Sequence, residues 1–338
     1  MRHPRLADLA LSFPALLFAL AVPRRGCDAE PALACVIGGR PLAEAAAAAG
    51  VPMWLRKLPP EAFDRPIDPL PDGELFRRQI ANHLPRSPKL MPTWLQLVSQ
   101  MAVLAHEPAA VWIAREFVRA PRAVNLDRMH LLGLWVWFSG QRATFGHGLT
   151  KRPWTPDMKL DAAVAAACVW RSMIALHLNL GQQPIRDMWL NPGRVGDYEF
   201  RPLHGVSDIN DEAAAMRNCV RTYGDDIAHN RSRLWSVRRG GERVATLEIA
   251  VRYRDPLLNI VQLKGPGNAA VPRELWWIAR RWLQMHELPQ IETGKIRWDQ
   301  ARLDEATWPA LWRPHWLAKR RIPHWLPIAP SRAALEAL

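Results

Sequence analysis

The sequence has few cysteines and no arrangement of them that would hold a metal ion or a redox disulfide. Its 338 residues include four cysteines, Cys27, Cys35, Cys168 and Cys219, and no two of them form a C-x-x-C pair. No histidine lies at metal-ligand spacing from any of them. This scarcity argues against a zinc site and against a disulfide-stapled secreted protein. We therefore expect a reducing, cytoplasmic location, no metal and no cofactor.

The sequence also lacks an N-terminal apolar run long enough to span a membrane. Residues 9–22 form a mainly apolar run of fourteen, but a transmembrane helix needs about 20 residues. Arginines flank the run on both sides, no A-x-A cleavage site follows it, and Pro14 interrupts it. We expect a buried core helix and no stable membrane insertion, with a targeting segment as the alternative.

Acidic residues are too few to balance the basic ones. The formal net charge is +13, whereas apolar residues make up 49% of the chain, as in ordinary globular proteins. A diffuse positive field favours association with polyanions such as nucleic acid. A general preference for arginine in the composition explains the charge equally well, so charge alone does not identify a partner.

Proline-bounded helices dominate the first half of the predicted fold. Apolar spacing predicts helices over residues 44–49, 76–84, 94–105, 109–117, 131–139, 161–180 and 185–190, with short helical turns between 52 and 63. We predict a multi-helical N-terminal domain over residues 1–190, a linker over 191–206, an α+β domain over 207–290 and a tail rich in Trp, Arg and Pro over 291–338.

The α+β domain is predicted as a helix, a three-stranded antiparallel meander and a second helix. The first helix begins at Asn210 or Asp211 and continues to about residue 228. Its predicted apolar face holds Met216, Cys219, Val220, Tyr223 and Ile227. Residues 234–238, 243–251 and 259–264 form the strands, with Gly240-Gly241 as a tight hairpin turn, and residues 272–286 form the closing helix.

Four short motifs in this domain resemble the PcfJ-like family, which is named for a protein encoded on a conjugative plasmid. They are Cys219-Val220-x-x-Tyr223, Leu234-Trp235-Ser236-Val237-Arg238, Thr246-Leu247-Glu248-Ile249 and Gln262-x-Lys264-Gly265-x-x-Asn268. The resemblance implies a protein associated with mobile elements and conjugation, in a family whose reaction is not established. Asn218 stands where many members have His, so the resemblance implies no adjacent Cys–His pair.

The motif residues are candidates for a site, and each also has a plain structural explanation. Cys219 could be a nucleophile, but its place on an apolar helical face favours a small core residue. Tyr223 on the same face is predicted as a core aromatic with a hydrogen-bonded hydroxyl. On the strands, Glu248, Gln262 and Lys264 share one sheet face that could bind a phosphate or a base, or could be ordinary solvated decoration.

The tail offers a second candidate surface. Trp316 and Trp325 lie in near-repeated Pro-His-Trp-Leu segments, and Lys319, Arg320 and Arg321 lie between them. Aromatic rings beside cations are typical of sites that bind single-stranded nucleic acid. Lys264, in the α+β domain, is a further candidate cation for nucleic acid. The alternative is that the tryptophans dock the tail onto the helical domain.

Three functions follow as hypotheses. The leading one is a nucleic-acid-associated module related to mobile-element proteins. The second is an enzyme whose site is built from Cys219, Glu248, Gln262, Lys264 and Asn268, with Tyr223 beside Cys219. The third is a protein-interaction scaffold built on the helical half, with other proteins as partners. The sequence does not decide whether the chain is an enzyme.

Overall fold

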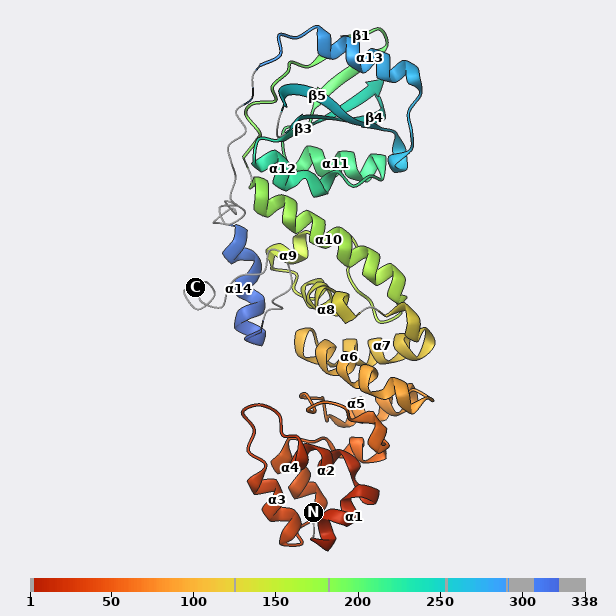
Figure 1. Ribbon diagram of the computed structural model, residues 1–338, viewed down its shortest axis with the longest axis vertical. Coiled ribbons are helices and arrows are strands. Elements are labelled where there is room, and N and C mark those ends of the chain that lie inside the picture. Colours follow the sequence, from red (N-terminus) through yellow and green to blue (C-terminus); the bar gives the residue numbers. More distant parts are fainter. Residues whose placement is uncertain are drawn as a thin grey trace. The chain divides into compact units, whose positions relative to one another are not determined.

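The computed structural model describes residues 3–124, 126–181, 183–252, 255–289, 291 and 307–321 (Figure 1). Contacts divide these residues into two compact units. The first extends to Cys168 and includes residues 314–321, and the second extends from Val169 to Arg313. The contact boundary between the units therefore falls inside one continuous helix, α10 (Leu160–Leu180), and the predicted domain bounds stay a prediction.

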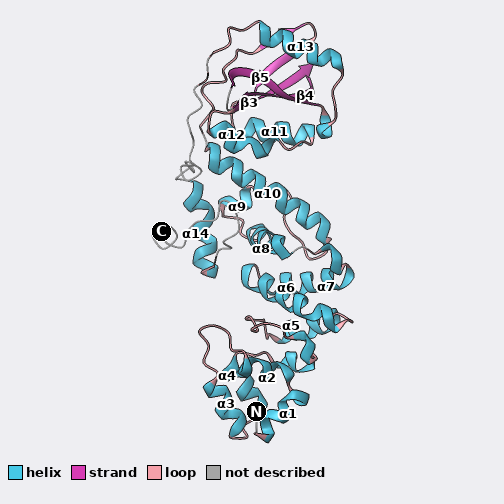
Figure 2. Cartoon of the chain, viewed as in Figure 1, coloured by secondary structure: helices cyan, strands magenta, loops and turns pink. Residues whose placement is uncertain are grey.

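The described part of the first unit consists of helices and loops (Figure 2). Several predicted helices are confirmed: α4 ends where Gly50 takes a left-handed φ of 64°, a conformation that glycine adopts without steric cost. The elements before α10 are α1 (Pro4–Ser12), α2 (Pro14–Ala21), α3 (Glu30–Ile37), α4 (Leu42–Ala49), η1 (Met53–Lys57), η2 (Pro60–Ala62), α5 (Glu74–Ile80), η3 (Ala81–His83), η4 (Pro88–Leu90), α6 (Met91–Leu104), α7 (Glu107–Arg119), η5 (Pro121–Ala123), α8 (Leu126–Ser139) and α9 (Phe145–Gly148).

The apolar N-terminal run forms two helices, so the prediction of a single helix over residues 9–22 is wrong. The break falls between α1 and α2, because Pro14 has no N–H to continue α1 and its ring hinders the preceding turn. Phe13 and Leu16 are fully buried, whereas Leu11 is 93% exposed. The run therefore contributes to the core mainly around the break.

One described helix, α10, is long and apolar enough to cross a membrane by length and composition. A core helix of a soluble protein passes the same test, and 39% of the apolar stretch of α10 is buried within the protein. The expected lack of membrane insertion therefore stays a prediction.

The second unit contains a five-stranded antiparallel sheet in the order β1-β2-β3-β4-β5, which curves as a half-barrel among helices. The predicted meander is confirmed as β3–β5, and the prediction of only three strands is wrong. Residues of the predicted linker form β1 and β2, which extend the sheet on the β3 edge. The strands are β1 (Gly193–Val195), β2 (Tyr198–Pro202), β3 (Ser232–Arg239), β4 (Glu242–Arg252) and β5 (Asp255–Lys264).

Helices cover the two faces of this sheet (Figure 1). On one face lies α13 (Arg273–Gln284), whose Trp282 stacks on Phe200 with ring centroids 4.4 Å apart. On the other face lie three helical elements that come between β2 and β3 in the chain: α11 (Val206–Met216), η6 (Val220–Tyr223) and α12 (Gly224–Ala228). The faces differ because strand residues alternate: Trp235, Leu247 and Leu263 point toward α13, and their neighbours point toward α11.

Two predicted helices are wrong. Residues 185–190 form no helix, because the Asp187 carboxylate binds the Trp189 amide and Trp189 takes a positive φ of 66°. The predicted helix over 210–228 is three elements, because α11 ends at Met216 and the next residue, Arg217, takes a left-handed φ of 49°. These departures place the residues of the candidate site on turns and not on one helical face.

Candidate functional site

Cys219 lies in the turn between α11 and η6, and its side chain is exposed. The prediction that it is a core residue is therefore wrong. Its Sγ is 3.9 Å from the side-chain amide nitrogen of Asn268, which ends η7 (Pro266–Asn268) after β5. A thiol and an amide donor that are far apart in the sequence thus meet at the surface.

Side-chain hydrogen bonds explain why the chain turns here. Asn218 donates to the Thr246 hydroxyl on β4 at 2.9 Å, which anchors the turn to the sheet. Arg221 donates from Nε to the Asn210 side-chain oxygen at 2.8 Å, which folds η6 back against α11. Asparagine side chains that form hydrogen bonds outside the helix favour a turn over a further helical turn of the backbone. Cys219, between these two anchors, is left facing solvent.

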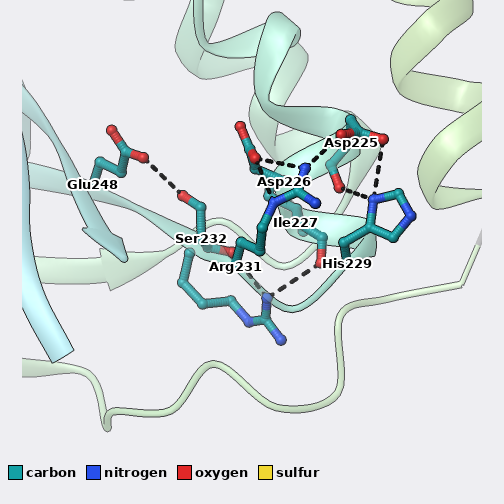
Figure 3. A network of polar contacts seen from close by, with 8 residues as sticks. Asp225, Asp226, Ile227, His229, Arg231, Ser232 and Glu248 are labelled. Carbon is teal, nitrogen blue, oxygen red and sulfur yellow. Dashed lines mark hydrogen bonds and ion pairs between the residues drawn. The ribbon is translucent and has the colours of Figure 1, made fainter. Parts of the chain in front are cut away.

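Glu248 and Tyr223 form a partly enclosed acid pair near this turn. Glu248 is 8% exposed, and its Oε1 accepts from the Ser232 hydroxyl at 3.2 Å (Figure 3). Tyr223 lies close enough to the same carboxylate for its charge to act on the phenol. Burial raises the pKa of Glu248, and burial together with the nearby Glu248 charge raises the pKa of Tyr223. Both groups therefore favour their protonated forms more than free side chains do.

Gln262 and Lys264 lie opposite Glu248 and Thr246 in the β4–β5 ladder, so all four share the sheet face toward α11. Gln262 is exposed and Lys264 is half-buried. A bulge between Glu248 and Ile249 interrupts the ladder beside them. The structure thus brings the predicted strand residues to one face, with Cys219 and Asn268 at the adjoining loops.

A buried carboxylate that sequence reasoning missed lies beside this cluster. Glu212 on α11 is fully buried and accepts from the Thr246 hydroxyl at 2.7 Å and from Nε of Arg243 at 2.9 Å. The signal was present in the spacing: Ile209, Glu212 and Met216 fall on one helical stripe, so Glu212 occupies an apolar position. A charged residue in such a stripe indicates a paired, buried group.

The link from α12 to β3 holds a further network of charges. Arg231 donates to Asp225 at 2.5 Å and to Asp226 at 2.8 Å, and the His229 ring lies 3.0 Å from the Asp225 carboxylate (Figure 3). Arg233, two residues after Arg231, is 5% exposed, and burial lowers its pKa to about 10. These contacts hold the start of β3 in place. They also hold Ser232, whose hydroxyl donates to Glu248.

Part of the predicted tail surface lies on α14 (Thr307–Lys319) and the residues after it. Trp316 is half-exposed, and the Arg320 guanidinium carbon is 5.9 Å from the centroid of its indole ring. Arg321 is exposed and Lys319 is half-buried, and burial lowers the Lys319 pKa. Trp325 lies outside the described residues.

Comparisons with known protein families, with curated proteins and with solved structures found no match. The PcfJ-like resemblance therefore stays a prediction, as does the scaffold hypothesis for the helical half. Within the residues that the structure describes, no group of three or more His, Cys, Asp or Glu side chains could hold a metal ion.

Proposed function

We propose that the chain is a nucleic-acid-associated protein, related in function to mobile-element proteins. The observation that carries the proposal is the stacking of Arg320 over the half-exposed Trp316, beside the exposed Arg321. A flat aromatic ring next to guanidinium groups binds both parts of a nucleotide, its base and its phosphate. The net charge of +13 would attract the polymer over longer distances.

A salt titration of the full chain tests this proposal. Fluorescence anisotropy would measure binding to labelled single- and double-stranded oligonucleotides between about 50 and about 300 mM salt. We expect log Kd to rise linearly with log salt, and the double variant Arg320→Gln/Arg321→Gln to lower the slope by about 2. The control is Arg142→Gln/Arg171→Gln, which removes two other exposed arginines. An equal effect of both variants, or no binding at low salt, contradicts the proposal.

The second candidate function is an enzyme that uses Cys219. It is favoured by the exposure of the thiol beside the Asn268 amide, with Glu248 on the adjoining sheet face and Tyr223 at the end of η6. An amide N–H can stabilise negative charge that develops on a substrate oxygen. The thiol would form the covalent bond, because the thiolate is the nucleophilic form of cysteine.

Alkylation kinetics test this second function without a known substrate. Iodoacetamide labelling of the native chain, followed by mass spectrometry, would compare Cys219 with the exposed Cys168. An activated thiol should react at least about tenfold faster than Cys168 under the same conditions. The variant Asn268→Ala should reduce that difference. Equal alkylation rates for the two cysteines would contradict the assignment of Cys219 as a nucleophile.

A further inference from the structure

We propose that a groove between α13 and the β1–β2 hairpin binds a single-stranded segment of nucleic acid, with one base stacked on Trp277 and the neighbouring phosphates held by arginines. The choice of ligand rests on the proposed function above. The site is separate from the α14 residues that carry that proposal, and none of its residues belongs to the PcfJ-like motifs.

The groove is an open depression of about 840 Å³ on the second unit. Its walls come from the outer side of α13 and from the hairpin that joins β1 to β2, which pack against each other (Figure 1). The residues that matter for binding are Tyr198, Arg239, Trp277, Arg280 and Arg281. A depression of this size can hold one or two nucleotides, since ligand sites commonly measure about 300–1,000 Å³.

Trp277 is exposed in a way that folding does not explain. Its side chain is 69% exposed, although it lies on the same helix as the fully buried Trp282. The buried face of α13 is formed by Leu275, Ala279 and Trp282, and Trp277 points away from it. The core therefore gains little from this indole. An exposed indole ring beside a groove can stack on a nucleic-acid base.

Both aromatic rings of the groove have a guanidinium group over them. The guanidinium carbon of Arg280 lies 5.9 Å from the Trp277 ring centroid, and that of Arg239 lies 5.3 Å from the Tyr198 ring centroid. Planar guanidinium groups that stack on rings keep their N–H groups free at the edge to bind phosphate. Each wall of the groove thus offers a flat surface and a cation together.

The groove is lined by acidic residues as well, but arginines outnumber them. Arg239 forms a 3.5 Å ion pair with Asp197, and both side chains are more than half exposed, so solvent weakens this pair. Among the residues that the structure describes, neither Arg280 nor Arg281 has an ion-pair partner. Glu274 is the remaining acidic residue of the lining. Arg280 and Arg281 are therefore available for phosphate.

The geometry favours unpaired bases over a duplex. In a duplex each base face is covered by the neighbouring base pairs, so an indole ring gains no stacking contact without unstacking them. A single strand can turn a base onto Trp277 while its backbone follows the arginines. The expected ligand is therefore a single strand with modest sequence preference.

Binding of three probes to the full chain tests the groove. They are an oligothymidylate of about 15 nucleotides, a duplex of equal length and an abasic strand that keeps the phosphates and lacks the bases. We expect Trp277→Ala to weaken single-strand binding at least about 5-fold, to leave abasic binding unchanged and so to remove the preference for bases. Trp277→Phe should retain part of that preference. Arg280→Gln/Arg281→Gln should weaken binding more than the control Arg273→Gln, an exposed arginine of α13 outside the groove.

The outcomes separate this inference from the proposed function. If the wild-type chain binds nucleic acid and Trp277→Ala binds each of the three probes as tightly as the wild type does, the groove is overturned and the proposed function stands. If the wild-type chain binds none of the probes, both fail. Equal competition by polyglutamate would also overturn the groove, because it would reduce the site to an attraction for negative charge.

Discussion

The two buried carboxylates of the α+β unit differ in how far their polar atoms are satisfied. Glu212 has a cation and a hydroxyl as partners, so its negative charge is compensated. Glu248 has the Ser232 hydroxyl on Oε1, whereas its buried Oε2 has no hydrogen-bond partner among the described residues, and burial raises the pKa of the carboxyl. Hydroxyl groups compensate a buried charge less than a guanidinium does. The folded state therefore favours the neutral, protonated form of the Glu248 carboxyl.

This difference predicts a pH dependence of stability. Because the folded pKa of Glu248 is raised above its ordinary 4.5, the native state binds the proton more tightly than the unfolded state. Its contribution to stability is present below about pH 4.5 and is lost as pH rises through the folded pKa. We expect Glu248→Gln to lack this loss, so that its free energy of unfolding relative to wild type increases with pH across that window.

Urea unfolding of both proteins between about pH 4 and about pH 8 would measure the effect. Asp211→Asn is a suitable control, because it removes an exposed carboxyl from the neighbouring helix. Parallel profiles for wild type and Glu248→Gln would show that the carboxyl is not perturbed in the folded state.

Among the elements, α11 is tied to β4 by one side chain in particular. The fully buried Glu212 joins the helix to Thr246 and Arg243 on the strand. Removing one partner of a buried ion pair leaves the others unsatisfied. The attachment of α11, and the turn that presents Cys219, depend on this contact.

We expect Glu212→Ala to lower the free energy of unfolding by about 2–4 kcal/mol, a value below that of a fully enclosed pair because the Arg243 side chain is 32% exposed. Glu212→Gln should lose less, since an amide oxygen can still accept from Thr246. Denaturant unfolding gives both values. The exposed Glu242→Ala, next to Arg243 on β4, should change stability by less than about 0.5 kcal/mol. Similar losses for Glu212→Ala and Glu242→Ala would contradict the role of Glu212.

The elements also show what local pattern predicts and what it does not. The strands β3 to β5 were predictable because their apolar and polar residues alternate around a Gly-Gly turn. The β1–β2 hairpin was missed because its strands are short and its residues are typical of loops. The break at Arg217 was missed for another reason: its cause, the bond from Asn218 to Thr246, joins residues far apart in sequence. The exposure of Cys219 follows from that break.

At the scale of the whole molecule, one helix belongs to two compact units. The residues of α10 up to Cys168 belong to the first unit, and those from Val169 belong to the second. Within the second unit, Leu176 is fully buried in an apolar cluster with Leu203 and Ile209. The α+β unit thus takes part of its core from before its first strand, which is why a boundary placed at a Pro- and Gly-rich segment differs from the contact boundary.

This shared helix predicts a large effect of a substitution far from the sheet in sequence. Leu176→Ala should lower the free energy of unfolding of the second unit by about 2–5 kcal/mol, through lost burial and a residual cavity. Hydrogen exchange of the β3 and β4 amides would report it. Val169→Ala on the same helix, 38% exposed, should leave that exchange nearly unchanged. Unaltered protection of β3 and β4 in Leu176→Ala would show that the sheet does not need α10.

The bulge between β4 and β5 has a consequence for how the chain tolerates changes of length. Glu248 is opposite Gln262 and Ile249 is opposite Ile260, so Val261 has no counterpart in the ladder. Deleting Val261 would join its two neighbours in regular alternation and would leave Gln262 and Lys264 on their present face. Deleting Leu263 would instead turn Lys264 toward the opposite face. Insertions and deletions in this strand should therefore be neutral at one position and disruptive a short distance away.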